Sequence, residues 1–173
     1  MPSPKYLKLN PSTGLNVEEA AVTTATPNSI PCTDATGHLT QAQMPTGVGP
    51  ELKQAMVSED LAAGNWVNFH SVGGVTKVRK ADATNSSKPA QGFVKAGFSV
   101  ATNDIADVYC DGQNADAAVS GLVAGSRCFL SATQPGATAA TPPSTAGNLV
   151  QCVGSALDGT TVLFKPEPGV VLA

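Results

Sequence analysis

Charged side chains are scarce in this sequence of 173 residues. Asp, Glu, Lys and Arg make up 13% of the chain, where roughly 25% is usual for a soluble globular domain. The formal net charge is −3, and the one basic cluster is Lys77, Arg79 and Lys80. A nucleic-acid binder needs clustered cations against the phosphates, so nucleic acid is not an expected partner. We interpret the alternating segment TKVRK as a solvated strand face, of which a guarded sheet edge is one form.

Long hydrophobic runs are also missing. No apolar stretch approaches the roughly 20 residues of a membrane-spanning helix. The first ten residues, MPSPKYLKLN, lack the apolar stretch of a signal peptide. We therefore expect no membrane partner and a protein that is made and kept in a cytoplasm-like compartment.

The sequence has no recognisable arrangement of catalytic or metal-binding side chains. His38 and His70 have no Cys, Ser or carboxylate nearby at a spacing that defines a nucleophilic or metal site. The acidic segment at residues 111–116 lacks the alternating ligands and closing Glu of a calcium loop. We expect a protein that is not an enzyme and has no catalytic residue, cofactor or metal.

The four cysteines are widely spaced, with no CxxC pair and no neighbouring histidine. In a reducing compartment, small buried or half-buried free thiols are the expected state, with a disulfide or metal site as the alternative. The cysteines are Cys32, Cys110, Cys128 and Cys152.

Aromatic residues make up only 5% of the chain, while glycine and proline number 17 and 13. The core must therefore consist mainly of Val, Leu and Ala, in short strands joined by turns. From residue 61 onward, short Val- and Phe-containing segments alternate with glycine-bearing turns, which is typical of a sandwich or barrel. We predict a mainly β fold, with a compact β-sandwich or β-barrel-like domain over residues 61–173. The uneven alternation in DIADVYC suggests a bulge near Ala106 or Asp107.

The N-terminal part has a different composition. Residues 1–50 are predicted to form an extended arm and Pro-rich linker, and residues 51–60 a short helical connector that begins after Pro50. Within the arm, a turn cluster at residues 10–14 separates two apolar segments, which predicts a hairpin or a bent extended arm. Two strands alone are marginally stable in water, so this arm must pack on something else. The predicted docking residues are Tyr6, Leu7, Leu9, Leu15 and Val17.

Two sequence matches at nearly the same offset indicate an internal repeat. Residues 61–64 (LAAG) match residues 122–125 (LVAG) at an offset of 61, and residues 91–96 (QGFVKA) match residues 151–156 (QCVGSA) at an offset of 60. In the second pair, each segment is followed by a further predicted strand, DVYCDG after the first and TVLFKP after the second. A unit of about sixty residues used twice predicts two halves that pack face to face, because neither can bury its apolar face alone.

A long segment without charge lies inside the second unit. Residues 131–147 read SATQPGATAATPPSTAG, and a loop longer than about 12 to 15 residues in a compact domain is usually functional or disordered. We interpret it as a strand-like excursion that meets a neighbouring subunit or a scaffold; a mobile surface loop is the alternative.

The sequence resembles structural proteins of tailed bacteriophages. The segment PNSIPCTDATGHLTQAQMPTGVG looks like the address segment of many virion proteins, with a turn at residues 34–37 followed by Leu39, Met44 and Pro45. Residues 61–94 are similar to small β-rich capsid decoration (cement) proteins, and residues 121–166 look like a module common in phage head and fibre proteins. The resemblance covers most of residues 5–172.

This resemblance implies a homotrimeric or otherwise oligomeric protein on the virion capsid surface, assembled in the host cytoplasm. Its partner would be the major capsid protein lattice, which it would bind from outside and reinforce. A tail, collar or head-fibre component is the alternative, since such proteins carry similar address segments. A carbohydrate-binding module is a third possibility, and the aromatic residues that it would use are Trp66, Tyr6 and Tyr109.

Overall fold

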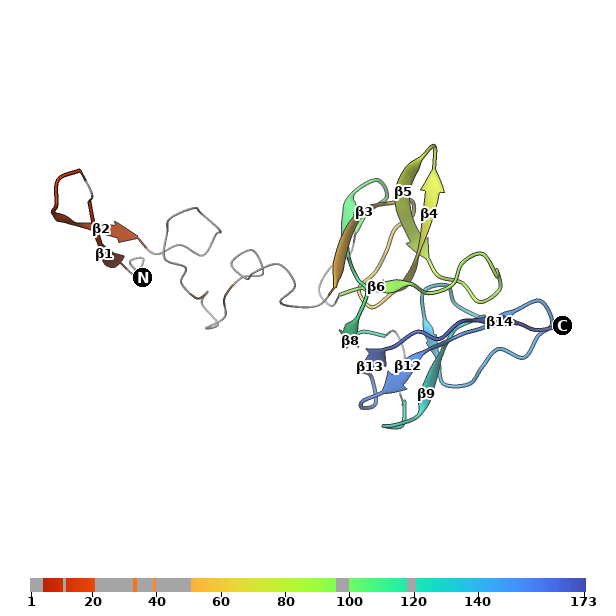
Figure 1. The fold of residues 1–173 in the computed structure, drawn as a ribbon. Helices are drawn as coiled ribbons and strands as arrows, with labels where there is room; N and C mark the ends of the chain where they lie inside the picture. The colour runs from red at the N-terminus through yellow and green to blue at the C-terminus, as the bar shows by residue number, and fades with distance from the viewer. Residues whose placement is uncertain are drawn as a thin grey trace. The chain divides into compact units, whose positions relative to one another are not determined.

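The computed structural model describes residues 5–10, 12–20, 33, 39, 51–95, 100–117 and 121–173. These residues form fourteen strands and no helix, so the mainly β prediction is confirmed. The chain divides into two compact units, residues 1–49 and residues 50–173. Figure 1 shows the strands of both units.

The described part of the first unit contains a β-hairpin. Strand β1 (Lys5–Leu9) pairs antiparallel with β2 (Asn16–Ala20). The predicted turn closes it, because the Asn10 N–H donates to the Leu15 carbonyl at 2.9 Å and the Gly14 N–H to the Asn10 carbonyl at 2.8 Å. The hairpin form of the arm is therefore confirmed.

The second unit begins with a closed five-stranded barrel. Its strands are β3 (Leu52–Val57), β4 (Trp66–Val72), β5 (Val75–Lys80), β6 (Gly92–Val94) and β7 (Ile105–Tyr109), in the order β3-β5-β4-β6-β7. A parallel contact between β3 and β5 closes it. Aliphatic side chains, mostly Ala and Val, fill the interior, as the low aromatic content requires. They are Ala55, Val57, Leu61, Val67, Val78, Val94, Ala106 and Val108.

The predicted helical connector at residues 51–60 is wrong. This segment contains strand β3, which pairs along its length with β7, from Leu52 opposite Tyr109 to Met56 opposite Ile105. Ala55 and Val57 point into the barrel and are buried. The local sequence ELKQAM is rich in helix-forming residues, but burial in the barrel and pairing with β7 outweigh that weak preference.

A second sheet follows the barrel. Its strands are β8 (Gly112–Asn114), β9 (Arg127–Leu130), β10 (Thr138–Ala139), β12 (Cys152–Ala156) and β13 (Val162–Phe164), in the order β10-β9-β12-β13-β8. A separate two-stranded ribbon pairs β11 (Leu149–Val150) with β14 (Val170–Val171). Figure 1 shows the barrel above this sheet, with β14 beside the C-terminus.

The two halves of this unit share one strand order, which confirms the internal repeat. The barrel reads β5-β4-β6-β7-β3 and the second sheet reads β10-β9-β12-β13-β8. The turns before β4 and β9 also carry equivalent hydrogen bonds. The Gly64 N–H donates to the Val94 carbonyl and the Gly125 N–H to the Ala156 carbonyl, both at 2.8 Å.

The details of the repeat differ from the sequence match at one place. Trp66 lies opposite Phe93 and Arg127 opposite Ser155, so Phe93 corresponds to Ser155 and not to Val153. The cause is a register shift between Cys152 and Gly154 in β12.

The predicted bulge in β7, near Ala106 or Asp107, is wrong, because no irregularity interrupts the β3–β7 ladder. Ile105 is exposed and Ala106 is buried, and the strand alternates regularly.

The second sheet differs from the first because it does not close on itself. Its edge strands β8 and β10 are not paired with each other, whereas the equivalent β3 and β5 are. The segment that enters β4 connects these two edges instead. The Asn114 Nδ2 donates to the Gly64 carbonyl at 2.9 Å, and the Trp66 N–H donates to the Gly136 carbonyl at 2.8 Å. A segment of the first repeat, at residues 64–66, therefore joins the two open edges of the second sheet.

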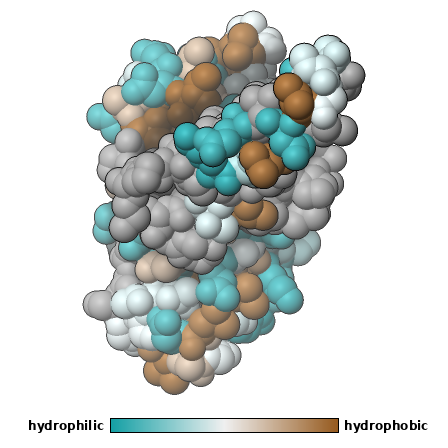
Figure 2. Space-filling model, turned by 90° about the vertical axis from the view of Figure 1, so that its left-hand side faces the viewer, coloured by the Kyte–Doolittle hydropathy of each residue, from teal (hydrophilic) through white to brown (hydrophobic). Residues whose placement is uncertain are grey.

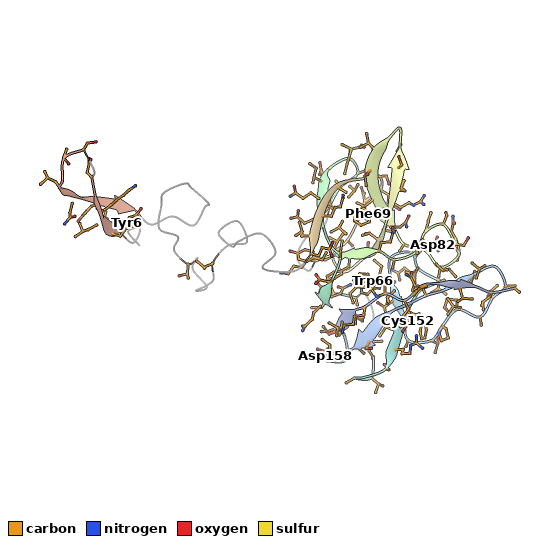
Figure 3. The ribbon with its side chains drawn as sticks, in the orientation of Figure 1. Tyr6, Trp66, Phe69, Asp82, Cys152 and Asp158 are labelled. Carbon is orange, nitrogen blue, oxygen red and sulfur yellow. The ribbon has the colours of Figure 1, made fainter. Side chains whose placement is uncertain are left out.

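Trp66 links the two halves. Its indole Nε1 donates to Thr138 Oγ1 at 2.9 Å, and its ring stacks on Phe164 with centroids 5.1 Å apart. Phe93 meets Trp66 edge-on at 5.7 Å. Figure 3 shows Trp66 between the barrel and the second sheet. The cluster around it contains buried residues of both repeats, for example Ala90 of the first and Leu130 of the second. Residues 50–173 therefore form one domain with a shared core.

Candidate interaction surfaces

The arm hairpin exposes apolar side chains that it cannot bury by itself. Leu7 and Leu15 are 67% and 68% exposed, and Tyr6 is half-buried. The register places Leu7 opposite Glu18 and Tyr6 opposite Glu19. Since neighbouring residues of a strand point to opposite faces, Tyr6 and Leu7 lie on different faces of the hairpin. The exposed apolar surface of the hairpin is therefore described for Leu7 and Leu15.

The remaining two predicted docking residues are placed by backbone register only. Leu9 lies opposite Asn16, and Val17 lies opposite Lys8. Lys5 forms an exposed ion pair with Glu18 at 3.0 Å. An exposed pair of this kind contributes roughly 0 to 1 kcal/mol, and a two-stranded hairpin alone is marginally stable in water. Of residues 27–49, only Thr33 and Leu39 are described, and both are exposed. The predicted turn at residues 34–37, Met44 and Pro45 lie outside the described residues.

A second surface is marked by its lack of charged side chains. The thirty residues 128–157 contain no Asp, Glu, Lys or Arg, and neither do residues 168–173. The β11–β14 ribbon brings these two segments together, because the Leu172 N–H donates to the Asn148 carbonyl and the Gly147 N–H to the Leu172 carbonyl, both at 2.9 Å. We call the surface formed by residues 140–147 and 169–173 the uncharged end. Cores of protein interfaces are depleted of charge.

Strand β14 is the most apolar exposed element of the uncharged end. Val170 and Val171 are 66% and 51% exposed, although they are adjacent in one strand and point to opposite faces. Beside this ribbon lies an open cleft of about 250 Å³. Its walls carry hydroxyl groups from Ser131, Thr133, Thr141, Ser144 and Thr145. Figure 2 shows hydrophobic (brown) and hydrophilic (teal) residues side by side on the surface in view.

The long uncharged segment at residues 131–147 is only partly an excursion. Gly136, Ala137 and Thr138 are buried, and Thr138 pairs with Leu130 of β9. The first half of the segment therefore returns to the core and contacts Trp66. Residues 140–142 and 144–147 are exposed, so the outer half is the part available to a neighbouring molecule.

The basic cluster lies within the barrel wall. Strand β5 has neighbours on both sides, β4 and β3, so the interpretation of TKVRK as a sheet edge is wrong. Arg79 is engaged inside the chain, because its Nε donates to Asn68 Oδ1 at 3.0 Å and its Nη2 to the Ser87 carbonyl at 3.2 Å. Closure of the barrel is a long-range contact that the local alternation of charge cannot reveal.

Nδ1 of His70 is the one buried side-chain polar atom without a hydrogen-bond partner among the described residues. Its Nε2 lies 3.3 Å from Ser58 Oγ. Burial, followed by the positive charge of Arg79, lowers the pKa of His70 below its usual value. The other ionisable groups that act on it are Glu59, which raises the pKa, and Lys77, which lowers it. This is a local stability effect, and the surrounding residues do not form a site.

His70 should therefore make stability depend on pH. Because its pKa is lower in the folded state, the unfolded chain binds more protons, and stability falls as the pH drops below about 6.5. We expect His70→Gln to reduce the loss of Tm between about pH 7.5 and about pH 5.5, measured by thermal unfolding. His38 is present in both proteins and cancels in the comparison. An equal loss of Tm in both proteins would contradict the assignment.

The described cysteines are free thiols. Cys128 and Cys152 are buried and Cys110 is half-buried. Burial raises the pKa of Cys110 and of Cys128, which keeps them in the unreactive thiol form. Cys32 lies outside the described residues. Within the described part of the chain, no group of three or more His, Cys, Asp or Glu side chains could hold a metal ion.

The aromatic residues expected in a carbohydrate-binding site do not form a platform. Trp66 is completely buried in the shared core. Tyr109 stacks on Phe93 with centroids 5.7 Å apart, and Lys95 lies over its ring. Tyr6 belongs to the separate arm unit. The Trp66 ring is therefore not available to stack on a sugar.

No helix among the described residues has the length and hydrophobicity that crossing a bilayer requires. The chain matches no protein-family model, no curated protein and no solved structure. Its functional interpretation therefore depends on its own residues.

Proposed function

We propose that this chain is a structural virion protein that binds the outside of a bacteriophage capsid lattice and stabilises it. The observation that carries the proposal is the arm hairpin with its exposed Leu7 and Leu15, and the uncharged end of the β domain, residues 140–147 and 169–173, supports it. A surface without charge supports close contact between protein backbones and offers nothing to a polyanion. The function is thus one of contact, with no bond-making step.

The arm hairpin carries the proposal because it is suited to dock on a partner. It exposes Leu7 and Leu15, and two strands alone are marginal in water. Contact with a capsid surface would bury these side chains and stabilise the hairpin. Ordering an arm on binding costs conformational entropy, and many symmetric copies offset this cost because each bound contact raises the effective concentration of the next. We include a homotrimer in the proposal, since a trimer supplies three arms.

A tail, collar or head-fibre role is the second candidate. The same domain and arm would then serve trimerisation and attachment at another place on the virion. The phage-like address segment favours this candidate as much as the first, because it is common to both classes.

Co-sedimentation tests the proposal and separates the two candidates. Purified protein is mixed with empty expanded heads, and separately with tails, of the phage that encodes it. We expect saturable co-sedimentation with heads. Residues 50–173 contain both hydrophobic clusters and form their own compact unit, so this fragment should fold but lose at least tenfold in bound copies. Leu7→Glu in the full chain should weaken binding in the same direction, while Val123→Glu, at an exposed turn of the β domain, should not.

Three outcomes would overturn parts of this proposal. Binding to tails and not to heads would favour the second candidate. Binding of residues 50–173 as strongly as the full chain would show that the arm does not dock. No saturable binding to either particle would contradict both candidates.

A further inference from the structure

The outer edge of strand β14 has backbone groups with no hydrogen-bond partner among the described residues. Along the β11–β14 ribbon, the Leu172 N–H bonds to the Asn148 carbonyl, whereas the Leu149 N–H points away from β14 and bonds to the Ala83 carbonyl at 2.7 Å. Leu149 and Val171 are therefore a pair that exchanges no hydrogen bonds. It follows that the N–H and the carbonyl of Val171 both point to the open side of β14. In the described part of the chain β14 pairs with β11 alone.

This edge lacks the charged side chains that often protect an edge strand, although β14 is short, with two residues, and follows Pro168. Natural sheet edges carry lysines, prolines or bulges that discourage further pairing. Strand β14 presents Val170 and Val171, flanked by Gly169 and Leu172, and residues 168–173 contain no charge. Glu167, the nearest charged residue in sequence, forms an ion pair with Arg127. An open, uncharged and β-branched edge is suited to accept another strand.

The edge is complementary to itself. In an antiparallel arrangement about a two-fold axis, Val171 would lie opposite Val171 of a second copy, and each residue would donate its outward N–H to the carbonyl of the other. Val170 of one copy would then lie opposite Leu172 of the other, an apolar pair on one face. Gly169 and Ala173, which have small side chains or none, would meet at the ends. No like charges are brought together.

We propose that the edge of β14 joins two copies of this chain by antiparallel strand pairing about a two-fold axis at Val171. Two exposed valines and a few backbone bonds cover far less than the roughly 1,200 Å² of a standard stable interface, so the contact is weak for an isolated pair. It gains strength where many copies are held side by side. The pairing does not depend on the proposed capsid function, and it is measured in solution without heads.

Sedimentation of the full chain tests the pairing through one backbone atom. Val171→Pro removes the outward N–H but no hydrogen bond inside the chain, since that N–H points away from β11. Val171→Thr keeps the β-branched shape and the N–H. We expect the wild-type protein and Val171→Thr to show a concentration-dependent species of twice the mass of the Val171→Pro species. The dissociation constant of the doubling should rise at least tenfold in Val171→Pro and change less than threefold in Val171→Thr.

Cross-linking gives a second readout that does not need the proline variant to fold. Paired residues that exchange both hydrogen bonds have Cα atoms about 5.5 Å apart, within the range of about 4.4 to 6.8 Å for a disulfide. Val171→Cys should therefore form a covalent dimer under mild oxidation. Val123→Cys, 71% exposed at a turn before β9, is the control and should form several-fold less.

Three results would overturn the proposal. The first is equal sedimentation of the wild-type protein and a folded Val171→Pro, whether both associate or neither does. The others are loss of the doubling in Val171→Thr as well, and equal cross-linking of Val171→Cys and Val123→Cys. Failure of head binding leaves these measurements unaffected, so the two proposals fail separately.

Discussion

Trp66→Ala is expected to lower the free energy of unfolding by about 3 to 5 kcal/mol, because Trp66 is the largest fully buried side chain among the described residues. Its ring contacts both Phe93 and Phe164. Its removal leaves a cavity in the core that both repeats share. It also leaves Thr138 Oγ1 without the indole donor. Chemical denaturation followed by circular dichroism measures the change.

A matched variant separates packing from hydrogen bonding. Trp66→Phe keeps most of the buried ring and loses the Nε1–Thr138 hydrogen bond, so its cost should be about 1 to 2 kcal/mol. Because the two repeats share this core, residues 50–173 of each protein should unfold in one transition. A loss below about 1 kcal/mol in Trp66→Ala, far short of the usual cost of a buried tryptophan, would contradict the role of Trp66. So would two separate transitions in the wild-type fragment of residues 50–173.

Gly64→Ala and Gly125→Ala should differ strongly, although the two glycines occupy equivalent turns of the repeat. Both have positive φ, +77° and +83°, so alanine costs about 1 to 2 kcal/mol at either position. A Cβ at Gly125 meets nothing within 4 Å, whereas a Cβ at Gly64 would overlap the Asp116 carbonyl. Relieving that overlap requires a backbone shift, and we expect an additional cost of about 1 to 3 kcal/mol.

This pair tests how the second sheet is completed. Gly64 approaches Asp116 because its segment bridges the edges of β8 and β10. The segment around Gly125 makes no such close approach. Denaturation midpoints of the two variants, measured side by side, give the difference directly. Equal destabilisation would mean that the close approach of the first repeat to the end of β8 is wrong.

Local sequence patterns predicted the fold class and the repeat for identifiable reasons. The turn LAAG recurs as LVAG because a glycine with positive φ is needed before each of β4 and β9. The arm hairpin follows from the turn cluster at residues 10–14. Strand β3 could not be predicted in this way, since it is defined by pairing with β7, about fifty residues away in sequence. Its helix-forming residues indicate the opposite local structure.

The sequence predicted the candidate interaction surfaces only in part. The uncharged segment at residues 131–147 stood out by composition. Its burial against Trp66 did not, because Gly136 and Thr138 resemble ordinary loop residues. The edge of β14 was missed altogether, since residues 170–171 have no pattern beyond two valines. A signal was nevertheless present, in the absence of charge from both residues 128–157 and residues 168–173.

The most direct test of the proposed capsid function is the temperature at which empty expanded heads rupture, measured by light scattering while the full-length protein is titrated in. We predict a rupture temperature that rises with the number of bound copies and reaches a plateau when the lattice is saturated. The fragment of residues 50–173 should raise it much less at the same concentration. A rupture temperature that stays constant while copies bind, or heads that bind no copies at all, would contradict a protein that stabilises the capsid.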